Sequence, residues 1–293
     1  MSQNPPIDIF GEVLFDYFPD GSRVLGGAPF NVAWHLQAFG VAPRFVSRIG
    51  DDVNGREIVD LMTDWGMSRD AVQLDPTHPT GSVRVTIEDD EPQYDIVSDS
   101  AYDFIDENLL PEPIGRGILY HGSLALRNPI ALAALQTLKS RHQGRIFIDV
   151  NLRDPWWHKQ TLFSLIADAN YIKLNENELT QLCPEPSDLA SAMRVFSDRF
   201  GLDLLIVTRG AQGAIVYDKQ QLIAVKPVMS NPVVDTVGAG DAFAAVFLLG
   251  LHQQWSIATT LERAQAFAGE LVGRRGATIA DREFYRSFDR QWT

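Results

Sequence analysis

The sequence is poor in cysteine and in long apolar runs. Cys183 is the single cysteine among 293 residues, so no disulfide framework can form and we expect a reducing compartment. No uncharged apolar run approaches the roughly 20 residues that span a membrane. Residues 1–9 also lack the basic and apolar regions of a secretion signal. These features predict a cytoplasmic protein.

Positive charge is also scarce. The chain has 25 lysines and arginines against 38 aspartates and glutamates, which gives a formal net charge of −13 at pH 7. Nucleic acids and anionic membranes bind to basic surfaces. The charge balance therefore argues against both classes of partner.

Two common nucleotide-binding loops are missing. No Gly-x-x-x-x-Gly-Lys-Ser/Thr pattern occurs, which excludes a P-loop. The first expected strand, residues 7–11, continues into Gly11-Glu12-Val13 instead of a Gly-x-Gly-x-x-Gly turn, which excludes a Rossmann dehydrogenase. Any phosphate groups must therefore be held by another kind of loop.

Strand-like and helical segments alternate along the chain, which is typical of a parallel sheet covered by helices on both faces. With 45% hydrophobic residues and 22 glycines, the chain can form one α/β domain. The predicted core strands are 7–11, 44–49, 118–121, 145–150, 171–174 and 204–208. The predicted helices are 53–65, 129–141, 189–200, 239–253, 257–274 and 281–291, with a hairpin at 213–218 and 221–228.

Two segments, residues 12–25 and 81–105, break this alternation. They contain strands without intervening helices, so they predict a small separate sheet inside the same domain. A thin sheet cannot bury apolar residues on both of its faces, and pairing with a second copy would cover them. We therefore expect a homodimer formed through these sheets. The residues interpreted as apolar on the two faces are Val83, Val85, Ile87, Tyr94 and Ile96.

The most informative segment is Asp235-Thr236-Val237-Gly238-Ala239-Gly240-Asp241, which leads into an apolar helix. Gly238 and Gly240 lack a Cβ, so the backbone can approach a ligand closely. The free amides at a helix start bind anions such as phosphate. Asp241 would repel a bound phosphate, so its position favours a general base for an attacking hydroxyl. The alternative is an ordinary helix-terminal charge, which stabilises by roughly 0.3–1 kcal/mol.

A second glycine-rich turn, Gly26-Gly27-Ala28-Pro29-Phe30-Asn31-Val32-Ala33, leads into a helix near the other end of the chain. Pro29 suits the first turn of that helix. Asn31 can both donate and accept hydrogen bonds, which suits the hydroxyl groups of a polyol. The alternative is that Asn31 caps its own helix.

Together the two segments resemble the paired motifs of the PfkB (ribokinase-like) family of carbohydrate kinases. The first matches Gly-Gly-Ala-Pro-x-Asn-x-Ala and the second matches Asp-Thr-x-Gly-Ala-Gly-Asp-Ala-Phe. Val246 departs from the pattern, since many relatives have Gly or Ala there, and this concerns local packing more than chemistry. The resemblance covers essentially the whole chain through further matches at Asp149-Val150-Asn151-Leu152-Arg153, Lys173-Leu174-Asn175-Glu176-Asn177-Glu178 and Thr208-Arg209-Gly210-Ala211-Gln212-Gly213.

The resemblance implies a three-layer α/β sandwich with a mostly parallel sheet, and a lid over the sugar site made by about 12–25 and 81–105. It implies transfer of the γ-phosphoryl group of ATP to a sugar hydroxyl, in a site that excludes water.

The expected catalytic residues gather around the second motif. Backbone amides of Gly238, Ala239 and Gly240 would stabilise charge on the transferred phosphate, and Asp241 would take the proton. Arg153 follows a predicted strand and is the expected cation for the transferred phosphate or a substrate oxygen.

The expected nucleotide site uses Asn175, Glu178, Thr208, Gly210 and Gly213. Asn175 and Glu178 share one face if a helix begins there, and the resemblance implies that they orient water around Mg²⁺ and the ATP phosphates. The alternative is a capping arrangement with a surface carboxylate. The resemblance places ATP against Thr208 and the glycine turn at 210–213, and a plain hairpin turn is the competing interpretation.

The expected sugar site consists of Asp16, Asn31 and the backbone of Gly27, because a carboxylate accepts hydrogen bonds from two neighbouring hydroxyls. The resemblance also implies a monovalent cation, usually K⁺, held by Asp235 and nearby carbonyls, with residues 274–278 as a second wall. Alternatively, Asp235 only caps the anion-binding loop, residues 235–241.

The sugar itself is predicted from finer resemblance. The opening Gly11-Glu12-Val13-Leu14-Phe15-Asp16 and the Asp149-x-Asn-x-Arg153 motif look most like bacterial fructokinases. We predict phosphorylation of D-fructose, at O6 in preference to O1. Ribokinase-type or 2-keto-3-deoxygluconate-type activity is the alternative, and a non-catalytic sugar- or nucleotide-binding regulator is a remote one.

Overall fold

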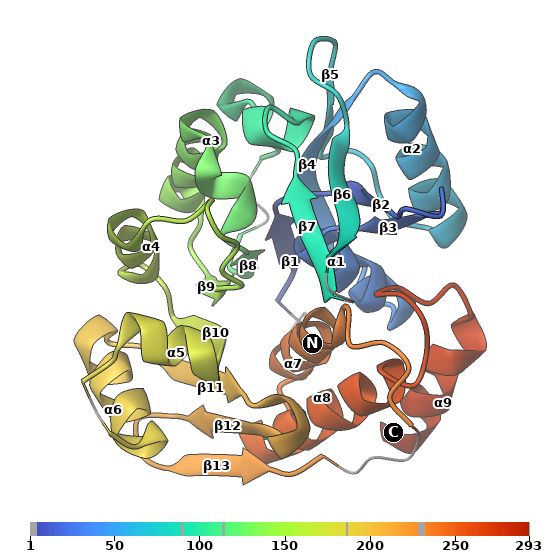
Figure 1. The fold of residues 1–293 in the computed structure, drawn as a ribbon. Coiled ribbons are helices and arrows are strands. Elements are labelled where there is room, and N and C mark those ends of the chain that lie inside the picture. The colour runs from blue at the N-terminus through green and yellow to red at the C-terminus, as the bar shows by residue number, and fades with distance from the viewer. Residues whose placement is uncertain (1–4, 89–90, 113–114, 186, 228–231, 293) are drawn as a thin grey trace.

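The computed structural model describes residues 5–88, 91–112, 115–185, 187–227 and 232–292, whose strands form two sheets. The large sheet has the strand order β13-β12-β11-β10-β9-β8-β1-β4-β5 (Figure 1). Strands β1, β4, β5 and β8 to β11 are parallel to one another, while β12 pairs antiparallel with both β11 and β13 and forms the predicted hairpin with β13 at one edge. These strands are β1 (Ile7–Phe10), β4 (Arg44–Gly50), β5 (Val72–Asp75), β8 (Ile118–His121), β9 (Arg145–Asp149), β10 (Tyr171–Asn175), β11 (Leu204–Thr208), β12 (Ala214–Tyr217) and β13 (Leu222–Val225).

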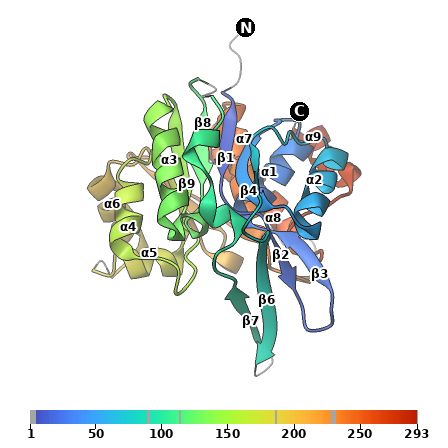
Figure 2. The same cartoon turned by 90° about the horizontal axis from the view of Figure 1, so that it is seen from above.

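Helices cover both faces of the large sheet and give the predicted three layers (Figure 2). One layer contains α1 (Ala28–Ala38), α2 (Val53–Trp65), α7 (Ala239–His252), α8 (Ile257–Leu271) and α9 (Arg282–Trp292). The other contains α3 (Pro129–Arg141), α4 (Lys159–Ile166), α5 (Glu176–Leu182) and α6 (Leu189–Phe200). Within the described ranges, no helix is long and apolar enough to cross a membrane.

Each strand of the sheet interior contributes to two apolar cores because its side chains alternate between the faces. In β1, Ile9 packs in the core beneath α1 and α7, and Phe10 packs in the core beneath α3 to α6. Both side chains are fully buried. Strands that are apolar on both faces are typical of parallel sheets, so the continuous apolar runs correctly predicted this architecture.

Helix α8 ends earlier than the sequence analysis predicts. The prediction extended it to residue 274, but the helix ends at Leu271. The carbonyl of Val272 accepts hydrogen bonds from the amides of Val234 and Asp235, at 2.7 and 3.1 Å. The chain after α8 therefore turns to contact the anion-binding loop instead of continuing as a helix. Residue 228 of the predicted hairpin lies outside the described residues.

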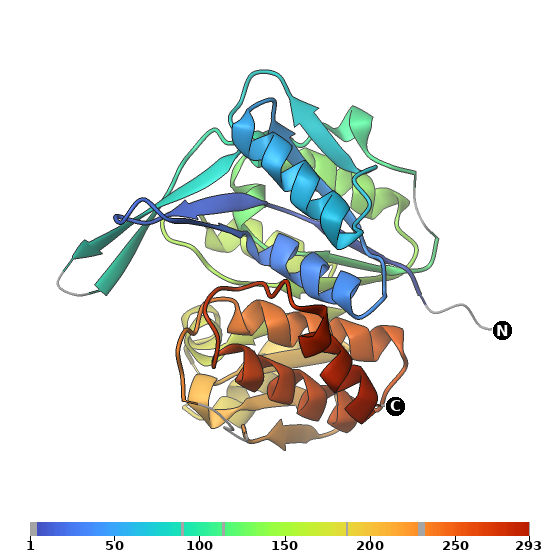
Figure 3. The ribbon, with the colours of Figure 1, turned by 90° about the vertical axis from the view of Figure 1, so that its right-hand side faces the viewer.

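The small sheet has the order β3-β2-β6-β7 and comes from the two predicted segments. Its strands are β2 (Leu14–Tyr17), β3 (Arg23–Gly26), β6 (Gly81–Glu88) and β7 (Glu91–Ile96). It projects from the side of the molecule opposite the N-terminus (Figures 2 and 3). The chain returns to the large sheet through the short 3-10 helix η1 (Ala101–Phe104), close to η3 (Leu124–Arg127).

The prediction that this sheet is apolar on both faces is wrong. Val83 pairs with Ile96 and Val85 with Tyr94, and residues that pair across strands share a face. Residues 83 and 85 are two apart, so Val83, Val85, Tyr94 and Ile96 all belong to one face, while the side chain of Ile87 is outside the described part of the chain. The opposite face carries Arg84 and Asp95 at this position. Val83, Val85 and Ile96 on this face pack against the chain's own domain around Tyr102, whereas Tyr94 on the same face is exposed.

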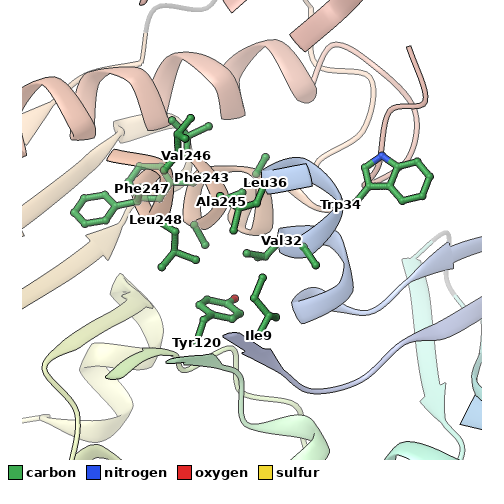
Figure 4. Close-up of a cluster of buried hydrophobic side chains, with 14 of the residues drawn as sticks. Ile9, Val32, Trp34, Leu36, Tyr120, Phe243, Ala245, Val246, Phe247 and Leu248 are labelled. Atoms are coloured by element: carbon green, nitrogen blue, oxygen red, sulfur yellow. The ribbon is translucent and has the colours of Figure 1, made fainter. Parts of the chain in front are cut away.

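Val246, which departs from the family pattern, packs without difficulty. It is fully buried in α7 between the sheet and neighbouring helices, beside Phe243 and Phe247 (Figure 4). The two rings lie 6.0 Å apart in a stacked arrangement. The aromatic and aliphatic side chains around α7 thus accommodate the larger residue.

Candidate active site

The N-termini of α1 and α7 meet at the carboxyl-terminal edge of the parallel strands. This edge is where open α/β sheets bind their ligands. Gly11, directly after β1, lies against Pro29 of α1, and a Cβ on Gly11 would come within 2.4 Å of the proline ring. The close approach explains why glycine follows β1 and fixes where α1 begins.

Asn31 connects the two glycine-rich motifs. Its Nδ2 donates a hydrogen bond of 2.8 Å to Oδ2 of Asp241, although 210 residues separate them in sequence. The cap of α1 is Gly27, and no side chain caps that helix, so the alternative that Asn31 caps its own helix is wrong. The Oδ1 atom of Asn31 is buried without a hydrogen-bond partner. A buried acceptor without a partner costs folding free energy. It is free to accept a hydrogen bond from a ligand hydroxyl.

The anion-binding loop is held in a conformation that requires glycine. Gly238 is the N-cap of α7 in the left-handed conformation, with φ of 78°. A Cβ there would lie 2.4 Å from the Cβ of Ala277, so Ala277 lies directly against the loop. Ala239, Gly240 and Asp241 are the first three residues of α7. Their amides begin the helix, where they can face an anion.

The carboxyl group of Asp241 holds its proton more tightly than an ordinary aspartate. Burial raises the pKa of Asp241 to about 6, the hydrogen bond from Asn31 lowers it, and the charge of Asp149 raises it. Lys173 and Arg153 lower it further. A pKa near the working pH is favourable for a group that accepts a proton during a reaction.

A buried ion pair behind the loop was missed by the sequence analysis. Lys173 Nζ lies 2.9 and 2.8 Å from the two carboxylate oxygens of Asp149, and the hydroxyl of Tyr120 donates to the same carboxylate at 3.2 Å. A Cβ on Gly240 would lie 3.5 Å from Lys173 Nζ, so the ammonium lies next to the start of α7. A lysine inside an otherwise apolar strand was the signal in the sequence.

Asp16 lies on the inner face of the small sheet, in register with Val24 and Val83. Burial raises the pKa of Asp16 to about 6, and the charge of Arg153 lowers it. Arg153 is exposed in the loop between β9 and α4, yet its charge also acts on Asp241. The charge of Arg153 therefore acts on both the predicted sugar-site carboxylate and Asp241.

Asn175 and Glu178 form a capping box at the start of α5. The amide of Glu178 donates to Oδ1 of Asn175 at 2.9 Å, and the amide of Asn175 donates to Oε2 of Glu178 at 2.7 Å. Oε1 of Glu178 accepts the amide of Leu152 at 2.8 Å. Capping is thus present as the alternative stated, but the carboxylate is not on the surface, because Glu178 is only 7% exposed.

Thr208 ends β11 and is the register partner of Asn175 on β10, so these two predicted nucleotide-site residues are neighbours. Gly210 begins the 3-10 helix η4 (Gly210–Gln212), and Gly213 follows it with φ of 89°. A Cβ on Gly213 would lie 2.0 Å from the carbonyl oxygen of Val225. The turn therefore needs glycine to join the edge hairpin to the sheet.

Both oxygens of the Asp235 carboxylate accept backbone hydrogen bonds. The amide of Val237 donates to Oδ1 at 3.0 Å, and the amide of Gly276 donates to Oδ2 at 3.0 Å. Asp235 therefore fastens the anion-binding loop to the segment after α8. This is the capping role named as the alternative to a cation site.

Trp156 and Trp157 line a separate cavity of about 220 Å³ between α3 and α4. The guanidinium of Arg127 lies 4.4 Å from the ring centre of Trp156 and also lines this cavity. None of the predicted site residues lines it.

Comparison with known proteins agrees with this geometry. Residues 8–283 match a family described as "pfkB family carbohydrate kinase". The chain belongs to this family.

The chain is also similar to proteins that are named fructokinases. Over 312 aligned residues the chain is 30% identical to a fructokinase of Salmonella typhimurium, covering 99% of this chain and all of the relative. A fructokinase structure from Vibrio cholerae O395 with bound fructose, ADP and calcium ion has a TM-score of 0.82 at 27% identity, with 97% and 99% of the two chains covered. A double mutant of that enzyme, with fructose, ADP and potassium ion, has a TM-score of 0.82 at 26% identity, with 98% and 99% covered. The chain is a carbohydrate kinase with a ribokinase-like fold.

Proposed function

We propose that this PfkB kinase transfers the γ-phosphoryl group of ATP to D-fructose. The observation that carries the proposal is the contact between Asn31 and Asp241 at the start of α7. This contact supports the proposal because the proposed hydroxyl-binding side chain lies beside Asp241, the proposed base with a raised pKa, at the start of α7. Similarity to fructokinases that bind fructose and ADP supports the choice of substrates.

In the proposed reaction, a hydroxyl of the sugar lies at Asp241 and attacks the γ-phosphorus. Asp241 takes the hydroxyl proton as the new O–P bond forms, and the bond to the β-phosphate oxygen breaks to release ADP. The amides of Gly238, Ala239 and Gly240 and the guanidinium of Arg153 stabilise the charge that develops on the transferred group. Fixed donors in a site that excludes water need little reorganisation.

The remaining hydroxyl groups of the sugar are held by Asp16, Asn31 and the backbone of Gly27. The buried Oδ1 of Asn31 has no hydrogen-bond partner and can accept from a hydroxyl. The carboxylate of Asp16 can accept from two neighbouring hydroxyls. Residues 12–25 and 81–105, which contribute the small sheet, act as the lid over this site within a single domain.

The nucleotide lies along Asn175, Glu178, Thr208, Gly210 and Gly213, and Mg²⁺ accompanies its phosphates. Both carboxylate oxygens of Glu178 already accept backbone amides, which fits a role in orienting water around the ion better than direct ligation. Among the described residues, no group of three or more His, Cys, Asp and Glu side chains could hold a metal ion by itself. Mg²⁺ supplies positive charge to the phosphates when it is bound.

A monovalent cation is proposed beside the anion-binding loop, at Asp235 and nearby carbonyls. The potassium ion in the related Vibrio cholerae structure supports this assignment. The Asp235 carboxylate already accepts a hydrogen bond from the amide of Gly276, so a cation there would further stabilise the contact between the loop and Gly276.

The sugar is D-fructose, phosphorylated at O6 in preference to O1. A ribokinase-type or 2-keto-3-deoxygluconate-type activity is the second candidate, because the catalytic half of the site is common to these kinases. A coupled ADP-release assay with Mg²⁺, K⁺ and a panel of these sugars tests the choice, and phosphorus NMR of the product distinguishes O6 from O1. Turnover of ribose without turnover of fructose would replace the substrate and leave the mechanism unchanged. Calorimetric binding of sugar without turnover would favour the non-catalytic regulator.

Replacing Asn31 by leucine should weaken catalysis and shift its pH dependence. Because the Asn31 amide lowers the pKa of Asp241, its loss raises that pKa above about 6. Activity needs the ionised base. As the pH is lowered, the variant therefore loses activity at a higher pH than the wild type does. We expect kcat/KM to drop about 10- to 100-fold, the value of a hydrogen bond to a charged group.

The pH profile of kcat/KM for the Asn31→Leu variant is the measurement. Asn108→Leu is the matched control, because Asn108 also donates from its side chain to an aspartate, Asp106, but on an exposed surface. An unchanged acid limb in the Asn31 variant would show that this contact does not tune the base.

We also propose a homodimer formed through the small sheets. Strands β3 and β7 are the edges of that sheet, and Tyr17, Val24 and Tyr94 expose large apolar surface on it. Light scattering at working concentration should give about twice the mass of the 32.6 kDa chain. A strict monomer would rule this assembly out.

A further inference from the structure

Glu12 is a buried carboxyl group to which the sequence analysis assigned no role. It follows β1 directly, and the residue is 3% exposed. Burial raises the pKa of the Glu12 carboxyl group, and the backbone amides of Glu12 itself and of Ala28, the first residue of α1, act in the opposite direction. Its Oε2 atom is buried and has no hydrogen-bond partner. A buried carboxyl oxygen without a partner costs free energy unless a further group hydrogen-bonds to it.

The backbone holds Glu12 firmly against the first glycine-rich motif. A Cβ on Gly27 would lie 2.6 Å from the carbonyl oxygen of Glu12, so the two segments are in contact. The carbonyl of Gly27 accepts the amide of Asn31 at 2.8 Å, and the side chain of Asn31 reaches Asp241. Glu12 is thus joined through one helix turn to the residues that face the sugar.

Among the described residues no cation forms an ion pair with Glu12, although the charge of Arg127 interacts with it. Arg127 pairs with Asp103 at 2.7 Å, and Lys173 pairs with Asp149 at 2.8 Å. Arg153 remains, in an exposed loop. The charged and titratable groups that interact with Glu12 come from five elements around it, namely Asp241 of α7, Arg153 of the β9–α4 loop, Tyr120 of β8, Tyr102 of η1 and Arg127 of η3.

Three carboxyl groups, Glu12, Asp16 and Asp241, therefore share the charge of Arg153, which lowers the pKa of each. One cation cannot neutralise three buried carboxylates, and a buried carboxyl group without a partner keeps its proton instead. By residue exposure Glu12, at 3%, is the most buried of the three, since Asp16 and Asp241 are only partly buried. Burial raises its pKa to about 7, and the charge of Asp241 raises it as well.

We propose that Glu12 is a further sugar-site residue that stays protonated in the working enzyme and donates a hydrogen bond from Oε2 to a sugar oxygen. This inference rests on the proposed sugar kinase function and adds a donor to a site whose other sugar-binding side-chain oxygens, on Asp16 and Asn31, accept. A sugar hydroxyl that donates to Asp16 or Asn31 still has lone pairs, which a carboxylic acid can use. No proton leaves Glu12 during the reaction. A neutral Glu12 also adds no negative charge where the γ-phosphate must approach.

Glu12→Gln is the discriminating variant, because glutamine keeps the shape, offers an acceptor to the two amides and offers an N–H in place of the acid O–H. Sugar affinity is measured by calorimetric titration of fructose without nucleotide, between pH 6 and 9. Wild-type affinity should fall by about 10-fold per pH unit above about 7, as Glu12 ionises. Glu12→Gln should bind fructose within about 3-fold of the wild type at the acid end, and its affinity should not fall above pH 7.

Glu12→Ala removes the donor and should weaken fructose binding about 10-fold or more at pH 6.5. Glu262→Gln, the same change on the exposed side of α8, is the control and should keep the wild-type pH dependence. Thermal unfolding of each variant reports whether the fold is intact. If Glu12→Ala fails to fold, the pH dependence of Glu12→Gln alone tests the donor role.

The outcomes distinguish a failure of the donor role of Glu12 from a failure of the proposed function. If Glu12→Gln loses affinity as Glu12→Ala does, the site needs a carboxylate and the donor role is overturned. A wild-type affinity that does not change between pH 6 and 9 overturns it equally. If the wild type binds no sugar of the panel, the proposed function itself is wrong, and this inference falls with it.

Discussion

Replacing Asp241 by asparagine is expected to lower kcat by about 10²- to 10⁴-fold, the usual range for loss of a general base. The change preserves the shape of the side chain, and Asn31 Nδ2 can still donate to the remaining carbonyl oxygen, as it does to Oδ2 now. The helix amides and Arg153 remain, so residual turnover should come from binding and charge stabilisation alone. Fructose affinity should change little, because the lost function is proton acceptance.

The measurement is steady-state kcat by the coupled ADP-release assay, together with fructose binding by calorimetry. Asp198→Asn, on the exposed side of α6, is the control for the chemical change itself. The proposed mechanism is contradicted if Asp241→Asn keeps kcat within about tenfold of the wild type, since a base that contributes so little does not limit turnover. Loss of fructose binding together with kcat would instead assign Asp241 mainly to sugar binding.

The regular elements were the most predictable part of this fold because local interactions determine them. The prediction for α2 matches Val53–Trp65. Asp52 accepts the amide of Gly55 at the start of this helix, and Gly66 ends it in the left-handed conformation. Both residues are standard start and stop signals that can be seen in a single sequence. The prediction for α8 overshot although Gly273 follows the end of the helix, and the contact of Val272 with residues 234 and 235 accompanies that end.

The candidate site was predictable where a motif brings its own backbone geometry. Gly238 and Gly27 have the positive φ values that glycine tolerates, and the loops they form can be read from short segments. The contact between Asn31 and Asp241 joins residues from two such motifs, so the family resemblance was needed to place them together. Asn175 and Glu178 were placed on one face of a helix, but the burial of Glu178 depends on the loop at Leu152.

Glu12 and Lys173 could not be assigned from the sequence, since their roles depend on burial. Each is a charged residue in or beside an apolar strand, which marks it as unusual but does not reveal its partner. Lys173 lies on β10, and its partner Asp149 lies on the neighbouring strand β9, directly across in register. Only the strand order makes them a pair. The error about the faces of the small sheet had a different origin, because the alternation of residues 83, 85 and 87 already placed them on one side.

Replacing Lys173 by methionine is expected to destabilise the protein by about 3–5 kcal/mol, because it leaves the Asp149 carboxylate buried without its partner. Lys173 is 6% exposed and Asp149 is 2% exposed, so water cannot easily replace the lost contact. Burial alone would lower the pKa of Lys173, but the pair with Asp149 outweighs it and raises the pKa. Lys173 is therefore charged in the native state.

The same substitution should change catalysis through Asp241. Lys173 lowers the pKa of Asp241 while Asp149 raises it, so removal of the lysine alone leaves Asp241 beside an uncompensated negative charge. The acid limb of the kcat/KM profile then shifts to higher pH. The lost positive charge also lay beside Gly240, at the start of α7, where it adds to the field that attracts phosphate. We therefore expect a higher KM for ATP as well as a lower stability.

A double variant, Asp149→Asn with Lys173→Met, separates these two effects. Removing both charges takes away the uncompensated carboxylate, so urea unfolding should recover most of the lost free energy and the acid limb should return toward its wild-type position. The ATP affinity should stay weak, since the double variant still lacks the ammonium beside the helix start. If ATP affinity recovers together with stability, Lys173 has a structural role only. The positive field that attracts the phosphate groups then comes from the helix amides and Arg153 alone. If stability recovers and ATP affinity does not, the buried lysine belongs to the phosphate-binding machinery.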